Sequence, residues 1–359
     1  MKILHFDMGR EWRGGQRQCM LLHIGLLERG VESCLVCRQD GEFSKKDIKN
    51  MQTTKFGGEI SPITYKKFKA IINEIKPDIV HSHEAASLTP LLLAKLTGGK
   101  YQLVNTRRVD FSVNKNFISL KKYKNKQVNI VAVSDGIKNV LINDGIPAED
   151  IRVIHSCTTP IKPVSGTAVA DAKKLLGIEK DALVFGTVAN FSPHKDYHTL
   201  LNAYKIYLSK ANALSNLLLV GDGPLFDEIK YEAKVLGLAN SVIFTGFRTD
   251  VPLMLSCMDI FVVSSYLEGL NTSIIDAFFL SKPAVATNTG GIPELVEDGV
   301  TGYLSPVRNP QIFADKMLQL ANEPDKRKLF GKTAYKKAQG FTDNVMIEKY
   351  LKYYEELLA

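Results

Sequence analysis

The sequence predicts an α/β protein built from two doubly wound domains, each with a parallel β-sheet. Strand-like segments alternate with segments of helix length almost throughout the chain, which is the pattern of strand–helix–strand units. At 359 residues the chain is longer than one hydrophobic core usually grows, so two domains are expected. A composition of 45% hydrophobic and 23% charged residues is typical of a globular chain.

The first half of the chain begins with a strand-like segment, MKILHFD, followed by the apolar-periodic GGQRQCMLLHIGLLERG and a second strand, VESCLVC. Further strands are expected at DIVHSH, YQLVNT, NIVAVS and IRVIHS, with a helix between the last two that Ser134 caps and Gly145 ends. Cys34 and Cys37 lie three apart in a strand and point to opposite faces. With an odd total of five cysteines, buried thiols are predicted rather than a disulfide or a metal pair.

The second half starts after a proline-containing stretch from about Ser156 to Ala170, the predicted linker. The alternation then resumes with ALVFGTVANF, YHTLLNAYKIYLSKA, NLLLVGDGP, SVIFTGF, DIFVVSS and KPAVATN. The last segment, TDNVMIEKYLKYYEELLA, is an amphipathic helix with Thr342 as N-cap, and its apolar stripe predicts packing across the domain boundary. We expect domains over residues 1–160 and 161–341, facing each other across a cleft, with residues 342–359 as a terminal helix.

The charge balance indicates an anionic partner. The net charge is +8 and the basic residues concentrate in one run, interleaved with aromatic and aliphatic residues. Such a run favours a membrane surface or an anionic acceptor, although a solvated loop and an RNA-binding face are alternatives; the aromatic pattern of single-strand RNA binders is missing. No apolar run reaches the ~20 residues of a membrane span, so a cytoplasmic protein is expected. Any peripheral membrane contact would be made through the basic run. The basic residues of the run are Arg107, Arg108, Lys115, Lys121, Lys122, Lys124 and Lys126.

Glycines and small polar residues follow the predicted strands, where the loops of open α/β sheets bind ligands. They occur at Gly14-Gly15, in ANFSPHK, at Gly221 to Pro224, at Glu268 to Ser273 and at Gly290-Gly291. Within ANFSPHK, Lys195 is suited to neutralise the charge that develops on a departing diphosphate, with a solvated loop lysine as the alternative. A dinucleotide fingerprint with an acid ~20 residues on is missing, which argues against a dehydrogenase.

The segment EGLNTSIID joins a buried strand to a buried helix. Asn271 or Thr272 can cap that helix, and its N-terminus carries a partial positive charge suited to a phosphate. Asp276, one turn into the helix, can accept hydrogen bonds from vicinal ribose hydroxyls, and Glu268 would face the transferred sugar. An acid near a helix start also stabilises the helix dipole, which is the structural alternative.

His81 and His83 lie two apart and therefore share one face at a strand end. His83 is suited to line an acceptor pocket, and a satisfied structural histidine is the alternative. The sequence offers no third ligand nearby, so no metal is expected.

The EGLNTSIID segment resembles the E-x7-E motif of the glycosyltransferases of family 4, and KPAVATNTGGIPELVEDGVTGYL is similar to the Gly-Gly-x-Pro-Glu run of the same family. The resemblance implies a GT-B fold, two Rossmann-like domains with the C-terminal helix crossing back to the N-terminal domain. It also implies retention of anomeric configuration and no metal cofactor.

By the same resemblance, Glu268 contacts the donor sugar, Asp276 the ribose, Lys195 the diphosphate, Gly14 and Gly15 the donor phosphates, and Gly246 to Arg248 the base. Three departures stand out: Asp276 replaces the usual Glu, Asn190 replaces a phosphate-binding Arg, and Arg107 and Arg108 occupy the place of a strand-end His. The full predicted donor set is Gly14, Gly15, Asn190, Gly221, Gly223, Phe247, Arg248, Gly269, Leu270, Asn271, Thr272 and Asp276, beside the catalytic Glu268 and Lys195. The predicted acceptor side is His83, Arg107 and Arg108.

The resemblance implies transfer of a sugar from a nucleotide-diphosphate sugar, with UDP the expected base and GDP or ADP as alternatives. A cell-envelope glycan or a lipid-linked acceptor, such as lipopolysaccharide, is the expected acceptor. A GT-B nucleotide-sugar epimerase is the alternative enzyme, and a basic RNA- or membrane-binding scaffold is the non-enzymatic one.

Overall fold

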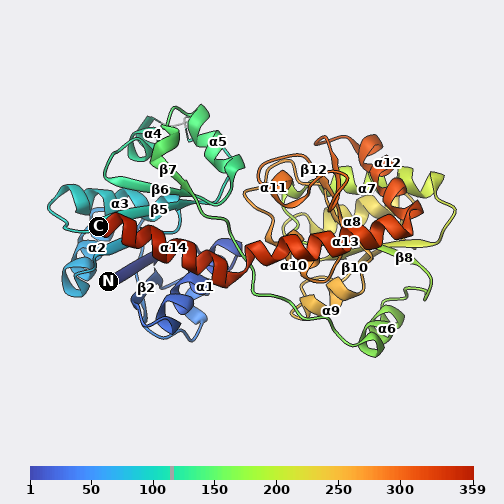
Figure 1. The fold of residues 1–359 in the computed structure, drawn as a ribbon, viewed down its shortest axis with the longest axis horizontal. Coiled ribbons are helices and arrows are strands. Elements are labelled where there is room, and N and C mark those ends of the chain that lie inside the picture. The colour runs from blue at the N-terminus through green and yellow to red at the C-terminus, as the bar shows by residue number, and fades with distance from the viewer. Residues whose placement is uncertain (114–116) are drawn as a thin grey trace. The chain divides into compact units, whose positions relative to one another are not determined.

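The computed structural model describes residues 1–113 and 117–359 (Figure 1). The chain divides into two compact units: unit 1 comprises Met1–Cys157 with Asp343–Ala359, and unit 2 comprises Thr158–Thr342. The boundaries expected from the sequence were 160/161 and 341/342. Each unit is an α/β structure with its own parallel sheet, as predicted.

Unit 1 contains a seven-stranded sheet in the order β3-β2-β1-β4-β5-β6-β7. The order reverses between β1 and β4, which are neighbours although two strands separate them in sequence. His5 of β1 lies opposite His81 of β4 in that pair. The strands are β1 (Lys2–Asp7), β2 (Glu32–Arg38), β3 (Met51–Thr54), β4 (Ile79–Ser82), β5 (Gln102–Arg107), β6 (Val128–Ala132) and β7 (Ile151–Val153).

Serine side chains cap two helices of unit 1. Ser134 accepts from Ile137 N at the start of α5, as predicted, and Ser61 accepts from Thr64 N at the start of α2. The helices are α1 (Gly14–Glu28), α2 (Pro62–Ile75), α3 (Ala85–Leu96), α4 (Phe117–Tyr123), α5 (Asp135–Asn143) and α14 (Asp343–Leu358), with short 3-10 turns η1 (Glu42–Lys45) and η2 (Ala148–Asp150).

The terminal helix α14 belongs to unit 1, which confirms that the end of the chain returns to the N-terminal domain. It lies beside α1 (Figure 1). Met346, Ile347, Tyr350 and Tyr354 are buried in a cluster that also contains residues of β1, α1, β4, β5 and β6. A Cβ on Gly25 of α1 would come within 2.0 Å of the Ile347 side chain, so glycine permits the close approach of the two helices.

Unit 2 contains a six-stranded sheet in the order β10-β9-β8-β11-β12-β13, and here the order reverses between β8 and β11. The strands are β8 (Leu183–Val188), β9 (Ser215–Val220), β10 (Val242–Phe244), β11 (Ile260–Val263), β12 (Ala284–Thr287) and β13 (Gly302–Ser305). The helices are α6 (Gly166–Leu175), α7 (Tyr197–Lys210), α8 (Phe226–Val235), α9 (Val251–Ser256), α10 (Thr272–Phe279), α11 (Ile292–Leu295), α12 (Pro310–Asn322) and α13 (Pro324–Ala338), with 3-10 turns η3 (Pro193–Lys195) and η4 (Gln339–Phe341).

The predicted linker is only partly irregular, because α6 begins at Gly166 with Ser165 as its cap.

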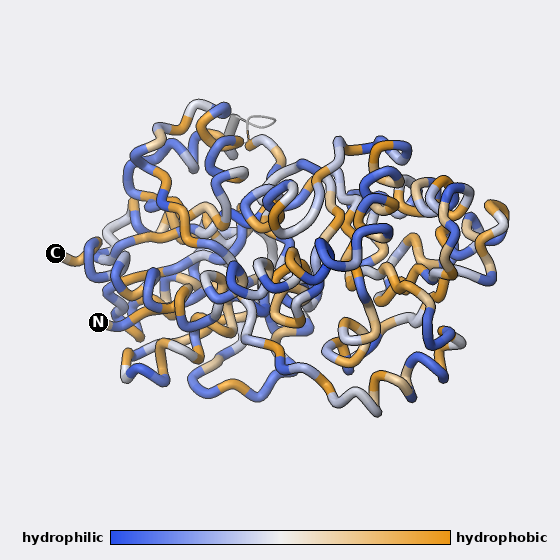
Figure 2. Tube along the Cα trace, turned by 45° about the vertical axis from the view of Figure 1, so that its right-hand side comes forward, coloured by the Kyte–Doolittle hydropathy of each residue, from blue (hydrophilic) through white to orange (hydrophobic). Residues whose placement is uncertain are grey.

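Most helices alternate hydrophobic and hydrophilic residues along their length (Figure 2). Such a pattern lets a helix bury its apolar stripe against neighbouring elements. All five cysteines are free thiols, with Cys37 buried and Cys34 partly buried on opposite faces of β2. Among the described residues, no helix is both long and apolar enough to cross a membrane.

Candidate functional site

The point where the sheet of unit 2 reverses its strand order brings two predicted residues together. Lys195 ends the turn η3 that follows β8, and Glu268 lies in the loop that follows β11. Ligands of doubly wound sheets bind at such switch points, outside the carboxyl ends of the strands. Lys195 Nζ lies 2.6 Å from Glu268 Oε2, and the two side chains are 16% and 12% exposed. The predicted catalytic pair is therefore an ion pair across the switch point.

The backbone around this ion pair is held by hydrogen bonds from neighbouring loops. Ser264 Oγ donates to the carbonyl of Lys195 at 2.8 Å. Gly291 N donates to the carbonyl of Glu268 at 3.2 Å, and Gly290 before it has a φ of 52°. The second glycine pair of the sequence thus forms the turn after β12 that fixes the Glu268 loop. Both charged side chains project from backbone that is already restrained.

The helix α10 begins directly after this loop. Asn271 caps it, accepting from Ile274 N at 3.2 Å and donating through Nδ2 to Glu268 Oε2 at 3.4 Å. Thr272 is the first helical residue, while Gly269 and Leu270 are buried in the loop. Asp276 lies one turn into α10 and is 6% exposed. The helix start, the acid at Glu268 and the ammonium of Lys195 therefore form one cluster, with Asp276 on the adjoining turn.

Gly221 and Gly223 lie in the loop after β9 and let it approach the loop after β8. Gly221 has a φ of 137°, and a Cβ there would lie 2.0 Å from the Ala189 carbonyl oxygen. A Cβ on Gly223 would lie 2.7 Å from Phe191 N and 2.8 Å from Asn190 Oδ1. These glycines are required for packing between the loops, whatever ligand they meet.

The predicted base-binding segment follows β10. Phe247 is 76% exposed. Arg248 makes two hydrogen bonds to Asp250, from Nε at 2.8 Å and from Nη2 at 2.6 Å. The guanidinium is therefore oriented by a neighbour on its own loop, and both residues lie at the carboxyl edge of the sheet.

One cation near Glu268 was missed by the sequence reasoning. The Arg308 guanidinium lies over the ring of Tyr266 at 4.4 Å, two residues before Glu268. Arg308 follows β13 and has a backbone φ of 55°, a conformation that non-glycine residues seldom adopt. Arg308 lies far from Glu268 in the sequence and belongs to no motif, so only the contact with Tyr266 reveals it.

In unit 1 two residues of the predicted acceptor side, His83 and Arg108, meet near the switch point between β1 and β4, beside Gly14 and Gly15 of the predicted donor set. Gly14 and Gly15 begin α1 after β1, and a Cβ on Gly15 would lie 3.4 Å from Arg108 Cδ. Arg108 Nη2 donates to His83 Nδ1 at 3.1 Å. Arg107 is buried, donates to the Phe111 carbonyl at 2.7 Å and stacks over the Phe111 ring. Arg107 is thus engaged inside unit 1, and Arg108 is the partly exposed member of the pair.

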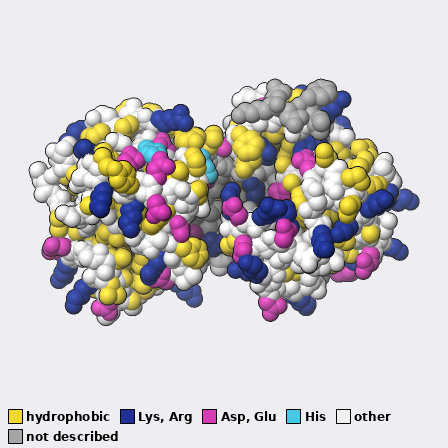
Figure 3. Space-filling view, turned by 180° about the vertical axis from the view of Figure 1, so that it is seen from behind, with side chains coloured by type: hydrophobic (Ala, Val, Ile, Leu, Met, Phe, Trp, Pro, Cys, Tyr) yellow, Lys and Arg dark blue, Asp and Glu magenta, His cyan; other side chains and the backbone are white. Residues whose placement is uncertain are grey.

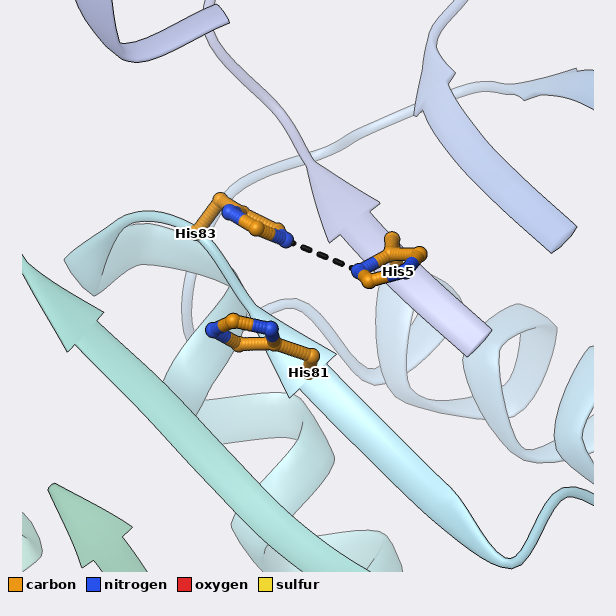
Figure 4. A group of neighbouring side chains, drawn as sticks. All are labelled: His5, His81 and His83. Carbon is orange, nitrogen blue, oxygen red and sulfur yellow. Dashed lines mark hydrogen bonds between the residues drawn. The ribbon is translucent and has the colours of Figure 1, made fainter. Parts of the chain in front are cut away.

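The structure adds a third histidine that the sequence did not associate with His81 and His83. His5 of β1 lies beside both, and all three are buried (Figure 4). His5 Nδ1 lies 2.9 Å from His83 Nε2, while His81 bonds Tyr354 Oη at 2.6 Å and Thr106 Oγ1 at 2.7 Å. The expectation that no third potential ligand lies nearby was therefore wrong. Parallel pairing of β1 with β4 brings His5 into the group.

Burial sets the ionisation of this cluster. It lowers the pKa of His5, His81 and His83 well below the ordinary value, because the charged form loses its hydration, and nearby basic residues, the other histidines and Arg108, lower it further. Burial raises the pKa of Asp7 and of Glu84 beside them, although hydrogen bonds oppose the shift. The imidazoles are therefore neutral near pH 7.

The basic run is not a uniform basic surface. Lys122 is 6% exposed and forms an ion pair with Glu59 and a 3.0 Å hydrogen bond to the Ala85 carbonyl. Lys121, Lys124 and Lys126 are exposed. Lys115 lies outside the described residues. Figure 3 does not mark the run, but on the face that it shows, basic side chains are interspersed with acidic ones. Arg107, Arg108, Lys122 and Lys126 each interact with another residue of unit 1.

Solved structures share this architecture over the full chain. HepE from Anabaena, solved in complex with UDP, matches with a TM-score of 0.88 at 22% identity and covers 99% of this chain and 100% of its own. A glycosyltransferase from Rickettsia africae matches with a TM-score of 0.88 at 20% identity, covering 99% and 98%. The fold is that of the GT-B glycosyltransferases.

Sequence comparisons assign the family. The model described as "Glycosyltransferase Family 4" matches residues 12–159, and that described as "Glycosyl transferases group 1" matches residues 169–337. The chain belongs to glycosyltransferase family 4 and is a glycosyltransferase. N-acetyl-alpha-D-glucosaminyl L-malate synthase of Bacillus anthracis is 26% identical over 78% of this chain and 75% of its own. The lipopolysaccharide core biosynthesis glycosyltransferase LpsE of Rhizobium meliloti is 25% identical over 98% of both chains.

Proposed function

We propose that this glycosyltransferase moves a sugar from a UDP-sugar to a cell-envelope glycan or a lipid-linked acceptor, with retention of anomeric configuration. The ion pair of Lys195 with Glu268, at the start of α10, carries the proposal. A departing diphosphate needs a cation and a positive helix end fixed before the bond breaks. Lys195 and α10 supply both within one restrained cluster, and the reaction requires no metal.

The residues around this cluster have distinct proposed roles. Lys195 stabilises the diphosphate. Glu268 contacts the transferred sugar and also orients the ammonium of Lys195. Asp276 accepts hydrogen bonds from the ribose hydroxyls. Because Asn190 carries no charge, the leaving group meets fewer cations from the loop after β8 than the family pattern supplies. Lys195 therefore bears more of the charge stabilisation in this chain.

The relatives support the choice of donor and acceptor. HepE was solved with UDP and with UDP-glucose. One related protein, from Escherichia coli, is named UDP-Gal:alpha-D-GlcNAc-diphosphoundecaprenol alpha-1,3-galactosyltransferase and is 23% identical over 90% of this chain. A uridine donor is therefore tested first, and GDP- and ADP-sugars form the comparison set.

The test begins with a thermal-shift screen of nucleotide sugars, since a ligand that binds the native state raises its apparent stability. The best donor is then incubated with and without candidate acceptors, and the anomeric configuration of the product is read by NMR. We expect UDP-sugars to stabilise the chain, EDTA to have no effect on turnover, and the product to retain the donor configuration. An inverted product would overturn the retaining mechanism. Epimerised donor without transfer would identify the chain as an epimerase.

We also propose that the protein works in the cytoplasm, in peripheral contact with anionic membrane through the exposed lysines of the basic run. Such contact would bring a lipid-linked acceptor to the enzyme. Sedimentation with liposomes containing anionic lipid tests it, with neutral liposomes as the control. Equal sedimentation with both kinds of liposome would contradict the proposal, and tight salt-sensitive RNA binding without nucleotide-sugar binding would favour the scaffold alternative.

A further inference from the structure

Three side chains at the switch point of unit 1 form a directional hydrogen-bond chain. Arg108 Nη2 lies 3.1 Å from His83 Nδ1, and His83 Nε2 lies 2.9 Å from His5 Nδ1 (Figure 4). A guanidinium can only donate, so His83 Nδ1 must accept. The proton of neutral His83 then lies on Nε2 and points at His5, whose Nδ1 must accept in turn. His5 therefore carries its own proton on Nε2. One charged donor thus fixes the tautomers of two buried imidazoles.

The same accounting decides whether the three histidines form a metal site. A metal ligand must offer a lone pair, and a neutral imidazole has only one. The lone pair of His83 Nδ1 accepts a hydrogen bond from Arg108, and the lone pair of His5 Nδ1 accepts one from His83. His81 uses both ring nitrogens, with Tyr354 and Thr106 as partners. The His5 Nε2 atom is buried with no hydrogen-bond partner among the described residues, and it bears a proton. The cluster thus presents a donor where a cation would need an acceptor.

Arg108, the outer member of the hydrogen-bond chain, lies where a ligand of unit 1 would bind. It follows β5 at the carboxyl edge of the sheet, and its side chain passes Gly15 at the start of α1. Its Nη2 points inward to His83 and its Nε is buried, yet the side chain remains partly exposed. Arg108 is therefore only partly enclosed, and a ligand at this edge of the sheet can reach it. Burial raises the pKa of the nearby Asp7 carboxyl, while its hydrogen bonds with Gln16 and Gly9 and the charge of Arg108 oppose that shift.

We propose that His83 and His5 are positioning residues, which hold Arg108 as a fixed donor to an anionic oxygen group of the substrate. The proposal deepens the proposed function, on which it rests, by naming phosphate or carboxylate as the chemistry recognised in unit 1. A guanidinium tethered on its inner edge loses less conformational freedom when it binds an oxyanion than a free arginine does. Loss of the tether should weaken binding and leave the donor site in unit 2 intact.

The first experiment reads the tautomers and needs no turnover. Long-range proton–nitrogen NMR on protein with labelled histidine distinguishes protonated from unprotonated ring nitrogens. We expect His83 and His5 to be protonated at Nε2 and unprotonated at Nδ1. In Arg108→Gln the amide can also donate, whereas Arg108→Leu removes the donor, so only the leucine variant should shift the Nδ1 signal of His83. Protonation of His83 at Nδ1 in the native protein would overturn the proposal.

The second experiment tests whether Arg108, held by His83 and His5, binds an oxyanion. Inorganic phosphate and malonate are titrated separately while the Nδ1 signal of His83 is followed, which distinguishes a phosphate from a carboxylate ligand. We expect a saturable shift with one of them in the native protein and none in Arg108→Leu. No shift with either anion would refute Arg108 as an oxyanion site, and it would do so even if the chain transfers sugar as proposed.

The third experiment uses conservative rescue in the enzyme assay. His83→Gln keeps an acceptor for Arg108 and a donor for His5, whereas His83→Leu keeps neither. We expect the leucine variant to raise the acceptor KM about tenfold with a smaller change in kcat, and the glutamine variant to recover most of the loss. The affinity for UDP should remain native in both. Equal behaviour of the two variants, or parallel loss of UDP affinity, would reduce His83 to a general structural role. If no UDP-sugar is turned over, the proposed function is wrong. The two NMR experiments do not depend on turnover, so they still test the histidine tautomers and oxyanion binding at Arg108.

Discussion

Glu268 Oε2 accepts hydrogen bonds from two directions, from Lys195 Nζ at 2.6 Å and from Asn271 Nδ2 at 3.4 Å. The residue that the sequence assigned to the sugar thus also orients the ammonium assigned to the diphosphate. Because both partners come from loops that meet at the reversal of strand order, the pair depends on the sheet topology. Substitution of either charge should disturb the other.

Glu268→Gln and Lys195→Met are expected to act as one unit. Each should lower kcat by about a hundred- to a thousandfold, or about 3 to 4 kcal/mol of transition-state stabilisation, since the fixed charge is lost. The double variant should be little worse than the single ones, because the two residues act together. Steady-state kinetics with circular dichroism as a check on folding measures this. Fully additive losses would show that the ion pair is incidental to the reaction.

Asp276→Asn should weaken binding of UDP about tenfold, or about 1.4 kcal/mol, because an amide accepts fewer hydrogen bonds from ribose hydroxyls than a carboxylate does. Calorimetry with UDP and with 2′-deoxy-UDP measures the effect. The native protein should discriminate between these two ligands more strongly than the variant. Asp276→Glu serves as the matched control, since it retains the charge. Unchanged discrimination in the Asn variant would remove the ribose role.

Gly221→Ala should destabilise unit 2 by about 2 kcal/mol or more. Its φ of 137° is unfavourable for alanine, and the new Cβ would lie 2.0 Å from the Ala189 carbonyl. Gly237→Ala is the control, since its φ of 77° carries the conformational cost with no atom within 4 Å of the new Cβ. Thermal unfolding should rank Gly221→Ala well below Gly237→Ala. Equal melting temperatures would show that the two loops separate at no cost.

Unit 1 should lose stability as the pH falls below about 6.5. The pKa values of His5, His81 and His83 are lowered in the folded state, so the unfolded chain takes up protons first. Each imidazole then removes about 1.4 kcal/mol of stability per pH unit until its folded pKa is reached. The raised pKa values of Asp7 and Glu84 act in the opposite direction at lower pH, since those carboxyls bind protons more readily in the fold.

Trp12 is the single tryptophan and packs against Phe43 inside unit 1, so its fluorescence reports unfolding of that unit by urea. The urea concentration at the unfolding midpoint should decrease when the pH is lowered from about 7.5 to about 5.5. His83→Gln should show a shallower dependence, because one imidazole is gone while a donor and an acceptor remain. A midpoint that does not change with pH would contradict the burial of three neutral imidazoles.

The basic run should separate into structural and surface lysines. Lys122→Gln removes a buried charge from Glu59 and leaves the Ala85 carbonyl without its ammonium donor, so it should lower the stability of unit 1 by about 2 to 4 kcal/mol. Lys121→Gln with Lys124→Gln should leave stability nearly unchanged and lower liposome sedimentation. Urea unfolding and sedimentation measure the two effects separately. A stable Lys122→Gln variant would contradict the burial.

The sequence alone determined the α/β class, the strand and helix alternation, the family resemblance and the grouping of Glu268 and Asp276 around one helix start. These features are local: hydrophobic period, capping residues and motif spacing reside in neighbouring residues. It also placed α14 on the N-terminal domain, because its apolar stripe needed a partner and the family pattern supplied one.

Tertiary structure alone decided which distant residues meet. The pairing of β1 with β4 brought His5 to His81 and His83, and the burial of α4 against neighbouring elements turned Lys122 from a surface charge into an internal one. Strand order depends on the packing of whole elements, and local periodicity does not encode it. The sequence therefore predicted which loops bear chemistry, while the order of the strands decided which side chains touch.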